Sequence, residues 1–193
     1  ISDAQFAICS PAVAPDAYAT VAAIQLSEGT KQSLPSDYHR LLGLTRNMGA
    51  DGATPGATIY GPVSRRSMDL MATGWHEEDA AATVTSYAYN PATPRVFWVD
   101  PPVPASPDVY VEGEFAAIPT ALSDLDSSIV LDDTYIPAIV EYVTYCFLVR
   151  DSERTPNMER ASRAAAMFFQ LLGVKVDKSL LPTPHRLEHK SGT

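Results

Sequence analysis

The chain has 193 residues, 46% of them hydrophobic, which is enough to bury the core of one domain or of one domain with an elaborated insert. Its formal net charge of −9 at pH 7 argues against a nucleic-acid binder that works by neutralising phosphates, because such proteins need a basic surface. The two cysteines, Cys9 and Cys146, are far apart and lie among apolar residues, so we expect core positions in a reducing environment and no disulfide framework or metal site.

The charge is unevenly distributed along the chain. Residues 1–149 carry six basic and eighteen acidic groups, a formal charge of −12, whereas residues 150–193 carry eight basic and five acidic groups, or +3. This asymmetry indicates either a partner for the basic end or a solvated tail. No window has the length of an uncharged membrane span, and no signal peptide is recognisable. Because the chain opens with Ile1 and not Met, we expect a segment upstream of it.

A short helix and then a β-rich region are predicted first. Residues 2–10 read as the end of a helix that Pro11 stops. Apolar and alternating runs predict the strands that follow. They are 20–34 (two strands around a turn at Glu28-Gly29), 41–49, 57–64, 82–90, 95–102 and 108–119, with a Gly- and Pro-rich loop at 50–56 and a short helix over 64–74 between Ser64 and Gly74.

The run LPSDYHRLLGLTRNMG, residues 34–49, mixes apolar and polar residues more closely than the other segments. Strand alternation predicts Leu42, Leu44 and Arg46 on one face and Leu41 with Thr45 on the other. The polar residues left for chemistry are Tyr38, His39, Arg40, Arg46 and Asn47. They are suited to an anion clamp in an enzyme, or to fixing loop carbonyls and reaching a neighbouring subunit, and we favour the second role.

Two helices are predicted in the last third of the chain. Over 134–150, apolar residues spaced three and four apart predict one buried face; they are Ile136, Ile139, Val140, Val143 and Phe147. Asp132 and Asp133 precede this helix as capping residues. Over 156–172, between Pro156 and Gly173, the predicted face holds Met158, Ala161, Ala165, Phe168 and Leu172, and the small residues of RASRAAA permit close approach of another helix.

Other candidates for chemistry are weak. The run HEED, residues 76–79, reads as a solvated acidic turn. His185 and His189 have the spacing of a metal pair on a helix, but Pro182 and Pro184 oppose a helix there. No phosphate-binding loop, dinucleotide fingerprint, nucleophile elbow or metalloprotease motif occurs. We therefore expect no catalytic residue, no cofactor and no metal.

Several segments together resemble the adaptor, or head-to-tail connector, proteins of short-tailed bacteriophages. The resemblance covers most of the chain in the family's order, and LPSDYHRLLGLTRNMG is its most specific part. The other segments that carry it are SDAQFAI at 2–8, GTKQSLPSDYHRLLGLTRNMGADGATPG at 29–56, RVFWVDPPVP at 95–104, IVLDDTYIPAIVEYVTYCFLVRDSE at 129–153 and RASRAAAMFFQLLGV at 160–174.

The resemblance implies an α+β fold, in which a helix bundle carries an inserted antiparallel β-rich domain. We expect the bundle, two long C-terminal helices plus an N-terminal helix, at 1–19 and 130–173, the inserted domain at 20–129 with a short helix near 64–73, and an extended tail at 174–193. The order of elements predicted from the residues agrees with this arrangement. Similar proteins carry a further helical segment before the position of residue 2.

The resemblance also implies a structural role without catalysis or cofactor. Such proteins form a ring, usually twelvefold, beneath the portal in the virion neck, where they extend the DNA channel and hold tail or nozzle proteins; assembly takes place in the host cytoplasm. We expect the tail to contact the portal through Leu180, Leu181, His185 and Arg186, and Arg40, Arg46 and Asn47 to fix a loop or touch the next subunit. The alternatives are a hydrolase or lyase that uses His39, Arg40 and Arg46, and a monomeric β-rich binding module with a helical stalk.

Overall fold

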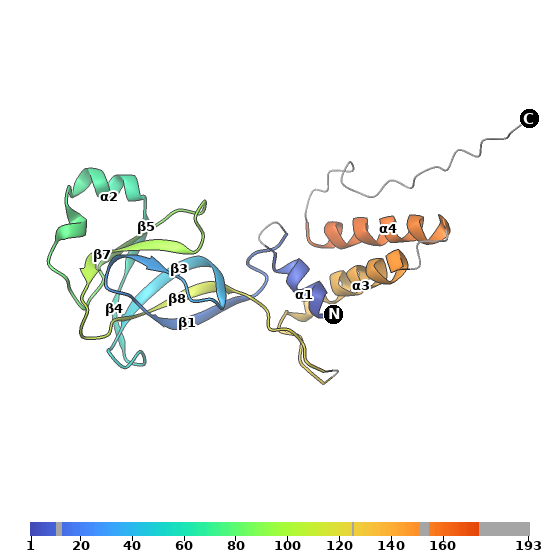
Figure 1. The fold of residues 1–193 in the computed structure, drawn as a ribbon, viewed down its shortest axis with the longest axis horizontal. Coiled ribbons are helices and arrows are strands. Elements are labelled where there is room, and N and C mark those ends of the chain that lie inside the picture. Colours follow the sequence, from blue (N-terminus) through green and yellow to red (C-terminus); the bar gives the residue numbers. More distant parts are fainter. Residues whose placement is uncertain (11–12, 125, 151–154, 174–193) are drawn as a thin grey trace, which may run out of the picture. The chain divides into compact units, whose positions relative to one another are not determined.

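The structure is a computed structural model that describes residues 1–10, 13–124, 126–150 and 155–173. Two compact units make up the chain: a β unit, Asp16–Ile118, and a helical unit, which combines Ile1–Pro15 with Pro119–Thr193 (Figure 1). The class is α+β, as the sequence predicted. The helix-bundle arrangement and the domain bounds expected from the sequence stay predictions.

Two four-stranded sheets form the β unit. The first has the order β1 (Ala19–Gln25), β8 (Tyr110–Ala117), β3 (Tyr38–Met48), β4 (Pro55–Thr58), and the second β2 (Gly29–Ser33), β7 (Val96–Val103), β6 (Ser86–Tyr89), β5 (Tyr60–Val63). All neighbouring strands are antiparallel except β5 and β6, which are parallel. The antiparallel pairing expected from the sequence is thus found throughout the described strands except at this one pair. The connection from β5 to β6 carries the helix α2 (Arg65–Met71) and is long enough to bring the chain back for parallel pairing.

The apolar faces of the two sheets share one core. Ile24, Leu44 and Phe115 enter it from the first sheet, and Tyr87 and Phe97 from the second. Only three residues, 26–28, separate β1 from β2, and Ile59 alone separates β4 from β5. The chain thus passes from one sheet to the other along two edges, and Ile59 is buried at the second crossing. The single strand predicted over 57–64 is split at this residue.

Strand β3 is irregular along its pairing with β8. The register shifts between residues 38 and 40, 41 and 43, and 44 and 46. Each shift adds a residue to one strand, so the buried positions of β3 recur every third residue, at Leu41, Leu44 and Asn47. The alternation predicted for this strand, with Leu42, Leu44 and Arg46 on one face, was wrong because it assumed an unbroken ladder.

The helical unit holds α1 (Ser2–Ile8), the short helix η2 (Asp133–Tyr135), α3 (Ile136–Arg150) and α4 (Thr155–Leu171). Helices α3 and α4 pack against each other, and Tyr142 of α3 meets Phe168 of α4 with ring centroids 5.3 Å apart. Ala161, Ala165 and Phe168 are buried, as predicted for α4. Gly173 follows the helix in a left-handed conformation, φ 69°, which satisfies the usual requirement for ending a helix.

The buried face of α3 differs from the predicted one. Ala138, Ile139 and Leu148 are buried, whereas four of the five residues expected to be inside are exposed. The exposed residues are Ile136, Val140, Val143 and Phe147. Periodicity detected an apolar stripe correctly but assigned it to the wrong side, because this helix is apolar around its whole circumference and α4 covers another face.

Helix α1 is bonded to the segment that leads into α3. The Leu122 amide donates to Ser2 Oγ at 3.2 Å, and the Val130 amide donates to Gln5 Oε1 at 3.0 Å. Ser2 and Gln5 are three residues apart and so share a helix face. No strand forms within the described residues between 119 and 132, where the sequence prediction still had the β-rich region.

Candidate functional site

Asn47 lies in the interior of the β unit, 4% exposed, with all three of its bonds going to backbone. Its Nδ2 donates to the carbonyls of Ala57 at 3.0 Å and Val84 at 2.7 Å, and its Oδ1 accepts from the Val84 amide at 2.8 Å. A buried carboxamide can make such bonds only where backbone groups lack ladder partners. Asn47 therefore joins β3 to the end of β4 and to the segment before β6.

Arg46 stands opposite Glu112 in the register of β3 and β8. The Arg46 Nε atom lies 2.8 Å from Glu112 Oε2, with the two side chains 42% and 25% exposed. The Nε–H has no acceptor in hydrogen-bond alignment, so the contact is an ion pair held by charge. Cross-strand pairs of this kind stabilise a sheet modestly, because water screens them.

Arg40 has a different carboxylate partner. Its Nη1 lies 3.3 Å from Asp16 Oδ1, near the beginning of the β unit. Arg40 and Arg46 are six positions apart on one strand, a separation on the order of 20 Å at the usual strand rise. The structure therefore does not bring the two guanidinium groups together on one small anion. His39 lies beside Arg40 on the same strand.

The loop after β3 is held by its own side chains. Asp51 accepts hydrogen bonds from the amides of Ala53 and Thr54 and from the Thr54 hydroxyl, at 3.0, 3.1 and 3.0 Å. These bonds favour the charged carboxylate and hold the pKa of Asp51 below its ordinary value. Gly52 has φ 66° and lies against the Tyr110 ring, where a Cβ would come within 3.1 Å of a ring carbon. The loop has a defined turn structure without any ligand.

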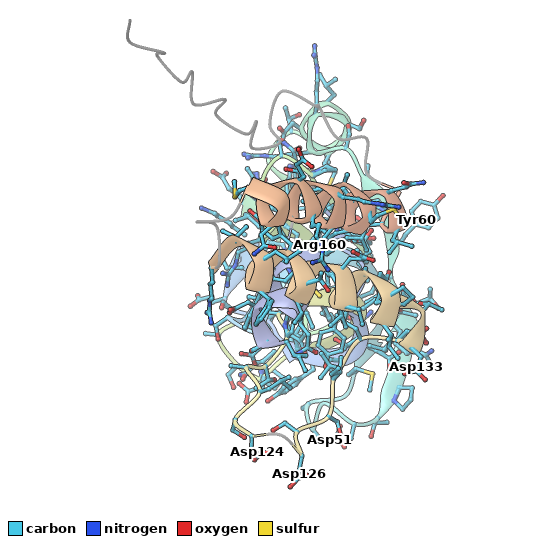
Figure 2. All side chains as sticks on the ribbon, turned by 90° about the vertical axis from the view of Figure 1, so that its right-hand side faces the viewer. Asp51, Tyr60, Asp124, Asp126, Asp133 and Arg160 are labelled. Atoms are coloured by element: carbon cyan, nitrogen blue, oxygen red, sulfur yellow. The ribbon has the colours of Figure 1, made fainter. Side chains whose placement is uncertain are left out.

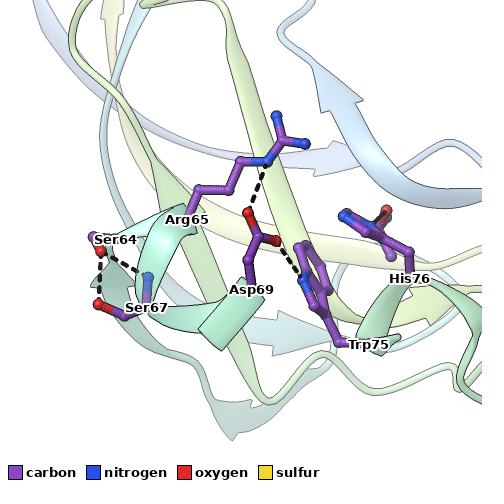
Figure 3. Close-up of polar contacts among 7 residues, drawn as sticks. Ser64, Arg65, Ser67, Asp69, Trp75 and His76 are labelled. Atoms are coloured by element: carbon purple, nitrogen blue, oxygen red, sulfur yellow. Dashed lines mark hydrogen bonds and ion pairs between the residues drawn. The ribbon is translucent and has the colours of Figure 1, made fainter. Parts of the chain in front are cut away.

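The HEED turn follows a Trp that anchors α2 to the second sheet (Figure 3). Trp75 is 2% exposed and donates from Nε1 to Asp69 Oδ1 at 3.0 Å. Arg65 lies 3.9 Å from the same carboxylate and stacks 4.6 Å above the Trp98 ring. His76 pairs with Thr30 Oγ1 through Nδ1 at 2.7 Å, and the three acidic residues that follow are exposed, as predicted for a solvated turn.

No group of three or more metal-ligating side chains occurs among the described residues. Asp132 accepts from the Thr134 amide at 2.9 Å, which makes it the cap of η2 and lowers its pKa. Cys9 is buried, and burial raises the pKa of its thiol to about 11. Neither residue has the surroundings of a reactive group.

The residues proposed for a portal contact, Leu180, Leu181, His185 and Arg186, lie outside the described residues. The structure instead reveals a surface that sequence reasoning assigned to the core. It is the outward side of α3, where Ile136, Val140, Val143 and Phe147 are exposed at 47, 56, 40 and 72%. Their spacing of four, three and four residues places them on one side of the helix. The signal was visible in the sequence, since α3 has only two charged residues, Glu141 and Arg150.

Comparison with known families identifies the chain. The family model described as SU10 adaptor protein matches residues 1–187. A search of curated proteins finds no match. The match covers nearly the whole chain and defines its class as a phage adaptor protein. The chain belongs to the SU10 adaptor protein family.

Family membership gives the chain a structural role as a head-tail adaptor. It implies an oligomeric assembly with portal and tail components in the virion neck, and the family is one of structural proteins. Among the described residues, no helix is long and apolar enough to cross a membrane. The resemblance drawn from the sequence segments is confirmed by this match.

Proposed function

We propose that this chain forms a homo-oligomeric ring, twelvefold as in similar adaptors, beneath the portal, where it joins the capsid to the tail and extends the DNA channel for genome retention and ejection. The family match over residues 1–187 is the observation that carries this proposal. In this role the helical bundle and the inserted β-rich domain are two parts of one ring subunit, and tail or nozzle proteins dock on the ring.

The negative charge of residues 1–149 supports the proposal of a channel through which DNA passes without being bound. Residues 1–149 carry a formal charge of −12, and phosphates are repelled by a surface of that sign. A basic lining would bind the backbone by releasing counterions and would oppose sliding. We therefore propose that acidic side chains line the channel and that the chain reads no base sequence.

The polar residues of β3 serve architecture in this proposal. Asn47 is the loop-fixing residue, supported by its three bonds to the backbone of residues 57 and 84. Arg40 and Arg46 each neutralise a carboxylate of the same chain, and their half-exposed guanidinium groups retain donors for a neighbouring subunit. The arrangement offers nothing specific to a hydrolase or lyase, so we do not propose a second function.

We propose that the tail makes the portal contact, through Leu180, Leu181, His185 and Arg186. The support is chemical: the run from residue 174 to 181 is apolar enough to require burial, and residues 150–193 are basic on balance. A basic, apolar segment is suited to an acidic groove on a partner.

Deletion of residues 175–193 tests the portal contact, and purified portal from the same phage is the partner to use. We expect the shortened chain to stay folded by circular dichroism and to lose portal binding in a pull-down or by native mass spectrometry. Unchanged binding would refute the role of the tail. Failure of the full-length chain to bind the portal would refute the proposed function itself.

A further inference from the structure

The outward side of α3 is an apolar surface whose side chains the described part of the chain leaves 40–72% exposed. We call Ile136, Val140, Val143 and Phe147 the α3 stripe. At 1.5 Å per residue the stripe extends for roughly 16 Å along the helix. Its exposed neighbours Pro137 and Thr144 are uncharged, so the surface carries no charge between its two ends. Phe147 is 72% exposed, which is unusual for a Phe ring on a helix that also has a buried side.

Helix α4 of the same unit exposes fewer large apolar side chains than α3 does. Its exposed residues are mostly polar, Glu159, Arg160, Arg163 and Gln170, and only Met167 and Leu171 add large apolar side chains that are 37 and 47% exposed. A helix that is apolar all round is normally enclosed by protein or lipid. Family membership implies an oligomeric assembly, so we infer that a neighbouring protein covers this surface.

A matching hollow lies between α3 and α4 of the same unit. This α3–α4 groove has a volume of about 330 Å³. Leu148, Ala164 and Met167 supply its apolar lining, and Glu141, Arg160 and Arg163 its charged side chains. Figure 2 looks onto the two helices, with Arg160 labelled on α4 and Asp133 near the start of α3. The volume is sufficient to receive large apolar side chains from a second helix.

The charges around the stripe and the groove are opposite in sign. The stripe is bordered by Asp133, just before Ile136, and by Asp3 and Arg150, which share a hollow with Val143 and Phe147, so two acidic groups stand against one basic group there. The groove carries two arginines against one glutamate. Acidic groups beside the apolar ridge and basic groups beside the groove would pair if the ridge of one copy entered the groove of another.

We propose that the α3 stripe packs into the α3–α4 groove of a second copy of this chain. The inference rests on the proposed adaptor role and adds to it the surface by which neighbouring copies recognise each other. Because stripe and groove are different surfaces, the contact is head-to-tail: each copy offers its stripe to one neighbour and its groove to the other. Such contacts repeat around a ring. Asp133 and Asp3 of one copy face Arg160 and Arg163 of the next.

Photo-crosslinking tests which molecule covers the stripe. A photoreactive Phe analogue replaces Val140, and the chain is assembled on purified portal before irradiation. We expect the crosslinks, mapped by mass spectrometry, to join position 140 to residues 160–167 of a second copy. Crosslinks confined to the portal, or to residues 174–193 of the same chain, would overturn the proposal.

Point variants test how much the α3 stripe contributes to ring assembly. Phe147→Asp and Val140→Asp alter exposed side chains, so we expect an unchanged melting temperature and retained portal binding of single copies. The yield of complete rings, measured by native mass spectrometry, should fall at least about tenfold, as for a central contact residue. Complete rings at the wild-type yield would contradict the proposal. Leu70→Asp is the matched control, since Leu70 is 75% exposed in the β unit; an equal loss there would also overturn it.

A charge exchange gives a readout that mere destabilisation cannot. Asp133→Arg and Arg163→Asp should each reduce the yield of complete rings, and the variant that carries both changes should restore it. If no combination of Asp3 or Asp133 with Arg160 or Arg163 restores the yield, the proposed pairing between the stripe and the groove is contradicted. Sedimentation at high concentration measures self-association of the chain without portal. This measurement distinguishes a failure of the stripe–groove contact from a failure of the proposed adaptor role. Wild-type chain should associate more strongly there than Phe147→Asp, whether or not the portal is bound.

Discussion

Asn47 and Val84 hydrogen-bond to each other twice: the Val84 amide donates to Asn47 Oδ1 at 2.8 Å, and Asn47 Nδ2 donates to the Val84 carbonyl at 2.7 Å. Residue 84 precedes β6 and has no sheet partner of its own among the described strands. The side chain of Asn47 thus takes the place of a neighbouring strand at a position 37 residues away in sequence. Both residues are almost fully buried, at 4% and 1% exposure.

Replacement of this carboxamide should be costly for the isolated chain. Asn47→Ala leaves the Val84 amide and carbonyl and the Ala57 carbonyl without their partners, and buried groups of this kind each cost about 1–3 kcal/mol when unpaired. We expect a loss of about 3 kcal/mol in the free energy of unfolding, measured by urea denaturation. A loss below about 0.5 kcal/mol would show that water substitutes freely for the side chain.

The Arg46–Glu112 pair should contribute little to the stability of a single chain. Its members are 42% and 25% exposed, so screening limits the interaction. A double-mutant cycle with Arg46→Ala and Glu112→Ala should give a coupling of about 0.5 kcal/mol that weakens as salt is added. Coupling above about 2 kcal/mol would indicate a buried, structurally essential pair. Conversely, a small stability effect of Arg46→Ala combined with lost ring assembly would assign Arg46 to the contact between subunits.

Asp69 should stabilise α2 through the indole of Trp75. Asp69→Ala removes the acceptor for an indole N–H that lies in a side chain only 2% exposed. We expect a cost of about 1–2 kcal/mol in thermal or urea unfolding. Arg65→Ala is the control: it removes the exposed pair 3.9 Å from the same carboxylate and its stacking on Trp98, and should cost less than about 1 kcal/mol. Equal effects would mean that the indole bond is unimportant.

Cys9 should be unreactive in the folded chain. Burial raises the pKa of its thiol from 9.0 to about 11. At pH 8 only about one such thiol in a thousand is ionised, and the thiolate is the reactive form. In a Cys146→Ser background, labelling by a thiol reagent at pH 8 should be at least about 100-fold slower than in urea. Equal rates in the two conditions would place Cys9 at the surface.

The raised pKa of Cys9 also determines how the free energy of unfolding changes with pH. Below pH 9 the thiol is neutral in both folded and unfolded chains, so its contribution to stability is fully present. Between 9.0 and about 11 the unfolded chain ionises first, and that contribution is lost as the pH rises. Cys9→Ala should therefore make the free energy of unfolding less dependent on pH in this window. An unchanged slope would contradict the raised pKa.

The order of elements in this fold was predictable because each follows from local signals. Ser64 caps α2 by accepting from the Ser67 amide at 3.0 Å, and Gly173 ends α4, both as the residue types predicted. Strand β7 was recognised from an apolar run that prolines end, and β8 from the alternation of its side chains. These features depend on neighbours in sequence, which a single sequence displays.

The predictions that were wrong concern features that depend on partners far away in the chain. The shifts of register along β3 arise from its fit to β8, so the burial of Leu41, Leu44 and Asn47 was not readable from alternation. Strand 82–90 was predicted too long because Val84 bonds to a side chain and not to a strand. Asn47 was expected to fix a loop or to touch the next subunit, but its bonds to Val84, 37 residues away in sequence, had no local signal.

The exposed side of α3 shows what apolar periodicity can and cannot predict. Apolar periodicity identifies a side of a helix that avoids water, but it does not say whether the cover comes from the same chain. In a subunit of an assembly the cover for Val140 and Phe147 is expected from a neighbour. Sequence reasoning placed them in the core of the monomer, and the structure leaves them exposed there.

The central claim is that this chain is a structural ring subunit that assembles on a portal. Native mass spectrometry of the full-length chain mixed with purified portal tests it most directly. The account predicts one dominant complex in which many copies of the chain, twelve in the simplest case, are bound to one portal ring, and a yield of this complex at least about tenfold lower for Phe147→Asp. Portal rings that stay free of the chain at saturating concentration would contradict it.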